Sequence, residues 1–240
     1  MNWLRTATQY LIPTLCMVCE QPQAEIVCYP CRDRIAQNRL QFGPSCLICA
    51  LPIRPHQSLC AQCDQEKPAF DRVTYLDLYR DPLRHPLHLL KYQKRLACAN
   101  GFALLWNIFH HHTLKACNAD VLIPVPLSPT KLATRGFNQA WEIAKRFDLP
   151  KSVRCIPNAI TCQATIAQAS LNRAERTTSM QDRFVLKEAA ATMIRGQHIL
   201  IVDDVMTTGS TFHSLATTLK HSGAKQVSAW AIFRTPPWKT

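Results

Sequence analysis

The stretch Gln197–Phe212, QHILIVDDVMTTGSTF, decides the fold of this chain. Its β-branched apolar run, Ile199–Val202, predicts a strand that is buried on both faces of a sheet. Two acids, Asp203 and Asp204, follow directly, and two residues later comes the small, hydroxyl-rich run Thr207–Thr211. Apolar residues at helical spacing come next, so the predicted order is strand, acids, small-residue loop and helix.

This order predicts an anion site at the edge of an open α/β sheet. In such sheets ligands sit where the carboxyl ends of strands meet the amino ends of helices. The backbone N–H groups of a loop at a helix start cradle phosphate, and the two acids suit ribose hydroxyls or a hydrated magnesium ion. The alternative is a helix capped by Ser210 or Thr211 with no ligand. Adjacent carboxylates repel each other without a ligand, which favours the anion site.

Composition predicts a folded, basic protein. Of the 240 residues, 47% are hydrophobic and 18% are charged, so the chain can bury a sizeable core. The formal net charge of +12 is uneven, because residues 1–70 hold six Lys/Arg and five Asp/Glu whereas residues 71–240 hold 22 and 11. We expect residues 71–240 to bind a diphosphorylated sugar, a nucleotide or nucleic acid. The alternative is that the basic residues only make the surface soluble.

The chain shows no sequence signal for membrane insertion. No apolar run approaches the ~20 residues of a transmembrane helix, and the start of the chain holds only a short, interrupted apolar stretch, unlike a signal peptide. We therefore expect a cytoplasmic protein.

Eight of the twelve cysteines form four CxxC pairs, which predict two structural zinc sites. The pairs are Cys16/Cys19, Cys28/Cys31, Cys46/Cys49 and Cys60/Cys63. Sequential and interleaved pairing both fit the spacing. With four protein ligands each site is closed, so we expect it to fold the segment and not to catalyse. The pattern turns strand-like over Pro68–Tyr79, which places a boundary near residue 70, between a zinc-ribbon domain (1–70) and an α/β domain (71–240).

Several helices and strands are expected in the α/β domain. Asp81-Pro82-Leu83 predicts an N-cap followed by proline at the first helical position, with the helix running through Lys94. Lys91, Lys94 and Arg95 near its end either complement the helix dipole or contact phosphate. The further expected elements are a helix over Ala97–Phe109, a buried strand over Ala119–Leu127, a helix over Gln139–Phe147 capped by Asn138, and a last strand over Gln226–Phe233.

The strand, acid pair and Thr-Thr-Gly-Ser-Thr loop resemble the signature of type I phosphoribosyltransferases, which use 5-phosphoribosyl 1-diphosphate. Further motifs resemble the ComF family, in which a double zinc ribbon precedes a domain of that type. These motifs are Tyr79-x-x-Pro82-Leu83-Arg84 with Lys91-Tyr92, the turn Pro124-Val125-Pro126-Leu127, and the box Arg135-Gly136-Phe137-Asn138-Gln139. The resemblance covers nearly the whole chain and implies a mostly parallel sheet with helices on both faces.

The resemblance also implies roles for individual residues. The acid pair would hold the ribose hydroxyls and the loop the 5′-phosphate, with magnesium bridging diphosphate and sugar. The turn Pro126–Lys131 would grip the diphosphate, and Arg135 would add a bidentate contact. The residues assigned to the sugar phosphate are Asp203, Asp204, Val205, Met206, Thr207, Thr208, Gly209, Ser210, Thr211, Lys131 and Arg135, of which Asp203, Asp204 and Arg135 would be catalytic.

The segment between Ile160 and Phe184 departs from the family pattern. Ser179 stands where the family has asparagine, and no arginine lies between Arg154 and Arg173. In related enzymes this segment covers the substrate. Arg173 and Arg176 would therefore close over diphosphate or touch a nucleic-acid backbone, unless they form a solvated basic face.

Two functions follow from the resemblance. In the first, the protein binds 5-phosphoribosyl 1-diphosphate with magnesium and serves DNA uptake in natural transformation, handling incoming single-stranded DNA at the cytoplasmic side. Its partners would be single-stranded DNA and a competence helicase or inner-membrane DNA channel, which allows a peripheral place at the inner membrane. In the second, it is an active phosphoribosyltransferase of nucleotide metabolism or salvage.

Overall fold

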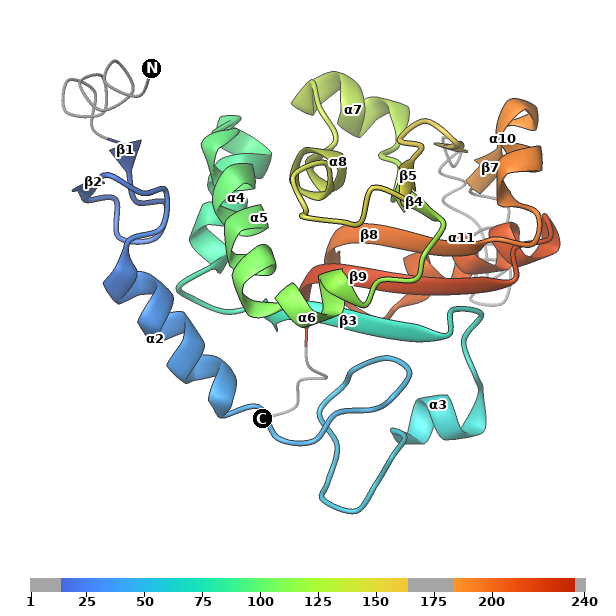
Figure 1. Cartoon of the computed structure of the whole chain (residues 1–240), viewed down its shortest axis with the longest axis horizontal. Coiled ribbons are helices and arrows are strands. Elements are labelled where there is room, and N and C mark those ends of the chain that lie inside the picture. The colour runs from blue at the N-terminus through green and yellow to red at the C-terminus, as the bar shows by residue number, and fades with distance from the viewer. Residues whose placement is uncertain (1–13, 164–183, 236–240) are drawn as a thin grey trace, which may run out of the picture.

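The computed structural model describes residues 14–163 and 184–235, and a five-stranded parallel sheet lies at its centre (Figure 1). The strand order is β3-β9-β8-β4-β5, and every neighbouring pair is parallel. The strands are β3 (Arg72–Leu78), β9 (Gln226–Arg234), β8 (His198–Met206), β4 (Val121–Pro124) and β5 (Arg154–Cys155). The predicted parallel α/β sheet is confirmed.

Helices cover both faces of this sheet, because β8 is apolar on both sides. Leu200 and Val202 belong to one buried core cluster, whereas Ile199 and Ile201 belong to the other, as the two-residue period of a strand requires. The first cluster receives α4 (Arg84–Gln93), α5 (Ala97–Phe109), α6 (His111–Lys115) and α8 (Gln139–Ala144). The second receives α10 (Glu188–Ile194), α11 (Ser210–His221) and the hairpin β6 (Ile160–Cys162)–β7 (Phe184–Leu186). Helix α7 (Pro129–Arg135) follows β4.

The cysteine-rich segment forms two small modules that pack against different core clusters. The first module contains the hairpin β1 (Thr14–Leu15)–β2 (Pro22–Gln23) and helix α2 (Tyr29–Leu40), and its buried residues join the cluster of α4 and α5. The second contains α3 (Ala61–Gln65) and joins the cluster of α11. In Figure 1 the first module runs down the left side, with β1 and β2 above α2, whereas α3 of the second lies at the lower right. The domain boundary near residue 70 stays a prediction; β3 begins at Arg72.

Some predicted element bounds were wrong. Asp81 does not cap the helix after it, because α4 begins at Arg84 with Leu83 as N-cap, and the Asp81 carboxylate instead pairs with Arg84 at 3.1 Å. Asn138 caps α8 as predicted, accepting from the Ala140 N–H at 2.9 Å. That helix ends at Ala144, because the chain tightens there into turns with bonds to the third preceding residue.

The helix predicted over Ala97–Phe109 is confirmed with those bounds. The strand predicted over Ala119–Leu127 is shorter, Val121–Pro124, and the last strand extends one residue further, to Arg234. Within 14–163 and 184–235, no helix is long and apolar enough to cross a membrane. Arg173 and Arg176 lie outside the described residues.

Candidate functional site

The loop after β8 forms an open helix start. Gly209 is the N-cap of α11 with a φ of 86°, a conformation that favours glycine, and a Cβ atom there would have to displace the end of the Met206 side chain, whose Cε would lie 2.6 Å away. Neither Ser210 nor Thr211 is the N-cap, so that alternative was wrong; Thr208 Oγ1 accepts from the Ser210 N–H at 3.3 Å. A hollow of about 20 Å³ lies at this end, lined by Asp203, Val205, Met206, Thr207, Gly209, Ser210, Thr211 and Phe212.

Both acids lie within β8, not after it, because β9 continues alongside and pairs Asp203 with Ala231 and Met206 with Arg234. Successive strand residues point to opposite faces. Asp203 therefore lines the hollow, whereas Asp204 faces the α4 side of the sheet, where Lys91 Nζ lies 2.8 Å from its Oδ2. The Asp204 side chain is 6% exposed and the Lys91 side chain is 18% exposed. Asp204 Oδ2 is thus the oxygen that Lys91 pairs with, and it is buried, with no further hydrogen bond from the described residues.

The two acids give this strand end an excess of negative charge. Burial, and then the charge of Asp204, raise the pKa of Asp203 well above its ordinary value, while Lys91 opposes the shift. Lys91 pairs with Asp204 and acts on Asp203, on the other face of β8, only through its charge. A divalent cation or a network of ribose hydroxyls would relieve this imbalance, so the donor set fits both ligands.

Helix α7 brings Arg135 to the same edge of the sheet. Its guanidinium lies over the Tyr92 ring, 5.9 Å from the centroid, and donates to Gln139 Oε1. Tyr92 is 66% exposed on α4, next to Lys91. Lys131 is exposed on α7. The structure thus brings α4, α7 and the end of β8 together.

The other two basic residues near the end of α4, Lys94 and Arg95, do not contact the acid pair. Lys94 is the exposed C-cap of α4, in left-handed conformation with a φ of 55°. Arg95 turns toward the first cysteine module, where its Nη1 lies 2.9 Å from Glu20 Oε1. Of the three, only Lys91 contacts the acid pair, and sequence spacing did not distinguish it from the others.

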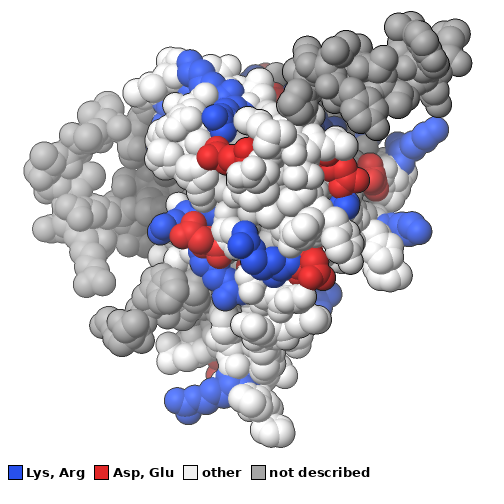
Figure 2. Space-filling view, turned by 90° about the vertical axis from the view of Figure 1, so that its left-hand side faces the viewer, with Lys and Arg blue, Asp and Glu red and all other residues white. Residues whose placement is uncertain are grey.

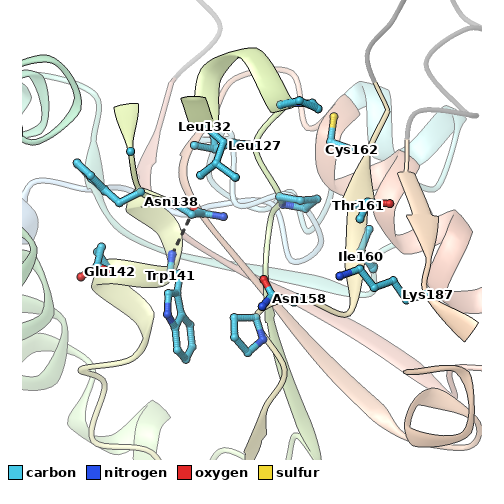
Figure 3. A pocket seen from close by; sticks show the side chains of 15 residues that line it. Leu127, Leu132, Asn138, Trp141, Glu142, Asn158, Ile160, Thr161, Cys162 and Lys187 are labelled. Carbon is cyan, nitrogen blue, oxygen red and sulfur yellow. Dashed lines mark hydrogen bonds between the residues drawn. The ribbon is translucent and has the colours of Figure 1, made fainter. Parts of the chain in front are cut away.

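A cavity of about 570 Å³ lies beside this site, between α7, α8 and β6 (Figure 3). Leu127, Trp141, Asn158 and Lys187 are among its lining residues. It shares no lining residue with the hollow at the start of α11. Its acid, Glu142, is already paired with Lys145 and Arg146. The larger cavity therefore offers room, whereas the open helix start and the acids lie at the end of β8.

The eight CxxC cysteines form two clusters with sequential pairing, so interleaving is excluded. Cys16, Cys19, Cys28 and Cys31 form one cluster and Cys46, Cys49, Cys60 and Cys63 the other, with all sulfur atoms of a cluster within 4.8 Å of one another. The Cys19 and Cys28 sulfurs lie 3.8 Å apart. A zinc–sulfur bond of about 2.3 Å in a tetrahedron requires sulfur separations of about 3.8 Å. Both clusters could hold zinc.

The two clusters share the same local design. Burial alone would raise the pKa of the Cys16 thiol, but backbone N–H groups, chiefly of Cys19 and Cys28, lower it to about 7. Cys46 repeats this pattern, with burial opposed by N–H groups of Cys49 and Cys60 and a pKa of about 7. Each cluster therefore surrounds its first cysteine with backbone donors that stabilise a thiolate.

Arg234 is a buried residue that the sequence pattern did not single out. It ends β9, is 2% exposed, and donates hydrogen bonds to backbone carbonyls of Cys49 and Met206, both at 3.1 Å. A basic residue at a strand end usually reaches solvent, so sequence alone carried no signal for it.

Comparisons with known proteins agree with this architecture. Residues 119–237 match the phosphoribosyl transferase domain family. DNA utilization protein YhgH of Escherichia coli is 31% identical over 231 residues, which cover 93% of this chain and 98% of that protein. Competence protein F of Haemophilus influenzae is 25% identical, covering 86% and 96%, and competence protein ComFC of Bacillus subtilis is 27% identical, covering 88% and 85%. With two four-cysteine clusters ahead of a phosphoribosyltransferase-type sheet, this chain belongs to the ComF family.

Proposed function

We propose that this protein binds 5-phosphoribosyl 1-diphosphate with magnesium at the end of β8, and that it serves DNA uptake by handling incoming single-stranded DNA at the cytoplasmic side. One observation carries the sugar-phosphate part. A helix start with Gly209 as N-cap, where Thr208 Oγ1 is the one side-chain acceptor recorded for its N–H groups among the described residues, lies directly beside the Asp203 carboxylate. A helix start attracts phosphate, and the neighbouring carboxylate accepts from ribose hydroxyls.

Each group of the ligand has a counterpart at this edge of the sheet. The 5′-phosphate would accept from backbone N–H groups of Thr207–Thr211, and the ribose hydroxyls would donate to Asp203 and Asp204. Magnesium would be held by these acids through its waters, and it supplies charge neutralisation for the diphosphate. Lys91 holds Asp204 in place through its ion pair with Oδ2.

The diphosphate would lie toward α7. Arg135 lies at the carboxyl end of this short helix, and its planar guanidinium suits bidentate phosphate contacts. Its contact with Gln139 orients that guanidinium before a ligand arrives. Lys131 on the same helix adds an exposed charge.

The proposed DNA role rests on the relatives and on charge. Two relatives are named competence proteins and one a DNA utilization protein. Residues 71–240 carry 22 Lys/Arg against 11 Asp/Glu. On the face shown in Figure 2, basic side chains alternate with acidic ones, so that face offers no unbroken basic track among the described residues. The Tyr92 ring is 66% exposed, although Arg135 and the His88 ring, 4.5 Å away between centroids, both contact it, and this exposed part would offer an aromatic surface to a base beside the proposed sugar-phosphate site.

Calorimetric titration tests the sugar-phosphate site. Zinc-loaded wild type should bind 5-phosphoribosyl 1-diphosphate with magnesium, and the Asp203→Asn/Asp204→Asn variant should lose this binding. The exposed pair Asp33→Asn/Glu188→Gln serves as the matched control for the charge change and should bind normally. Absence of binding by the wild type would refute the proposal.

Fluorescence anisotropy with labelled single-stranded DNA tests the DNA part. Tyr92→Leu should weaken binding about tenfold, since stacking on an aromatic ring contributes about 1–3 kcal/mol per base. Tyr29→Leu is the matched control, because Tyr29 is 72% exposed on the first cysteine module. Equal losses in both variants would show that Tyr92 has no special place in DNA binding.

The second candidate function is an active phosphoribosyltransferase. The cavity of about 570 Å³ beside α7 favours it, because it leaves room for an acceptor next to the turn Pro126–Lys131. Release of diphosphate in the presence of single purine or pyrimidine bases would support turnover. Tight binding of the sugar phosphate without release from any base would leave the binding function alone.

A further inference from the structure

Arg234 joins the second cysteine module to the phosphate loop. Its Nε donates to the Cys49 carbonyl at 3.1 Å, and its Nη1 donates to the carbonyls of Met206, at 3.1 Å, and Thr207. A buried guanidinium is tolerated only where its donors are satisfied. Two of the acceptor segments lie 185 and 28 residues away in sequence, and Nη1 also donates to the neighbouring Thr235 carbonyl at 2.8 Å. Losing the Cys49 carbonyl would leave the buried Nε without its acceptor.

Other contacts extend this junction along the loop and the first turn of α11. The Ala69 N–H donates to His213 Nδ1 at 3.2 Å, and the Phe70 ring meets the Phe212 ring edge-on at 6.4 Å. A cavity of about 220 Å³ lies between the two parts, with Cys49 and Cys63 on one side and Thr208, Gly209 and Ser210 on the other. The second module and the residues that follow it therefore pack against the loop and the first turn of α11.

The first cysteine module has no such contact among the described residues. Its Met17 packs against Gly101 of α5, and its Glu20 pairs with Arg95. Its buried residues belong to the core cluster on the α5 side, whereas Gly209 and Phe212 lie on the α11 side. The two clusters are alike in ligands and geometry, but the first packs against α5 and the second against the phosphate loop and α11.

We propose that the second cysteine cluster, Cys46, Cys49, Cys60 and Cys63, holds the phosphate loop in its binding conformation through Arg234 when it carries its metal. Cys49 is both a ligand in this cluster and the residue whose carbonyl Arg234 contacts. Losing the metal releases the Cys49 backbone, because such small modules fold around their ion. Arg234 is then a positioning residue, which acts on the ligand through the loop carbonyls.

This coupling must be reciprocal. If metal in the second cluster favours the binding conformation of the loop, a sugar phosphate on the loop must slow loss of that metal by the same free energy. Couplings of this kind are typically 5- to 150-fold, so we expect about a tenfold effect. A ligand that merely stabilised the whole fold would slow metal loss from both clusters equally. This readout rests on the proposed function, because it uses the sugar phosphate as ligand.

The first experiment follows zinc release to a zinc-selective chelator with and without 5-phosphoribosyl 1-diphosphate and magnesium. Release should show two phases, of which the ligand slows one about tenfold and leaves the other unchanged. Hydrogen exchange after the slowed and unslowed phases assigns them to residues 46–63 and 16–31. Equal slowing of both phases, or of neither when calorimetry shows that the ligand binds, would overturn the coupling while the proposed function stands.

The second experiment needs no ligand. Hydrogen exchange in residues 206–211 should rise about tenfold when zinc is removed from the second cluster, while exchange in α5 stays unchanged. Arg234→Lys should give an intermediate rise with zinc bound, because lysine keeps the charge but cannot fork to both segments. Arg80→Lys is the matched control, since Arg80 donates to the Asn38 carbonyl of the first module at 3.1 Å. Unchanged loop exchange after zinc loss would overturn the inference, even if the sugar phosphate does not bind at all.

Discussion

The ion pair between Lys91 and Asp204 is the most direct test of how the site is assembled. We expect Lys91→Met to destabilise the protein strongly, because the variant leaves Asp204 buried beside Asp203 without a counter-charge. The Nζ–Oδ2 distance is 2.8 Å. At an effective dielectric constant of about 20, this distance gives an attraction of about 6 kcal/mol before the cost of desolvation is counted.

Desolvation reduces this figure. Removing one partner of a fully buried pair costs about 3–5 kcal/mol. Asp204 is 6% exposed, but Lys91 keeps 18% exposure, which allows some solvation of the pair. We therefore expect Lys91→Met to lower the free energy of unfolding by about 2–3 kcal/mol. It should also raise the pKa of Asp203 further, since burial and Asp204 already raise it and Lys91 opposes them.

Guanidinium unfolding at neutral pH with saturating zinc measures this cost. The double variant Lys91→Met/Asp204→Asn should recover most of the lost stability, so the cycle should show a coupling of about 2 kcal/mol. Lys220→Met is the matched control, because Lys220 pairs with Asp71 at 2.9 Å with both side chains about one third exposed, and it should cost less than about 1 kcal/mol. Additive single effects, or a Lys91→Met cost no larger than that of the control, would refute the reasoning.

Further predictions concern single residues and the metal content. Asp203→Asn should raise the melting temperature by about 2–4 °C at pH 7 and abolish sugar-phosphate binding. Because the pKa of Asp203 is raised in the folded state, this gain in melting temperature should vanish below about pH 4, where the carboxyl is protonated in both the folded and the unfolded state. A gain that does not depend on pH would contradict this. Gly209→Ala should weaken sugar-phosphate binding at least tenfold and cost about 1–3 kcal/mol, because the residue has a positive φ and little space. Gly101→Ala should cost about 1–3 kcal/mol through its clash with Met17 but leave ligand affinity unchanged. Gly43→Ala, with open space around it, is the control for both glycines and should be neutral in calorimetric and thermal measurements. Metal analysis should find two zinc ions per chain; one ion would contradict the equal geometry of the two clusters.

Much of the fold was readable from local pattern. The apolar run of β8 is buried on both sides because its alternate residues reach two different cores, and the CxxC spacing brings pairs of thiols together within a single turn. The helix over Ala97–Phe109 and the Asn138 cap were also predictable, since both depend on residues within a few positions of one another.

The candidate site was only half readable in this way. The sequence located the acids and the small-residue loop but not their orientation, because β9 extends β8 past both acids and so turns them to opposite faces. Asp81 likewise failed as a cap because its carboxylate found Arg84. The orientation of the acids and the partner of Asp81 depend on which neighbouring groups compete for each side chain, and residue spacing along the sequence does not contain that information.

The sequence by itself therefore determined the elements, the donor sets and the family, because each is written in neighbouring residues. Only the tertiary structure decided which cysteine pairs share a cluster, which lysine meets Asp204, and that Arg234 binds the Cys49 carbonyl. Each cysteine cluster lies within one segment of the chain, whereas the other two contacts join distant residues, 185 positions apart for Arg234 and Cys49. The contacts of Asp204 and Arg234 form because the parallel sheet places the ends of β8 and β9 side by side, where distant segments reach them.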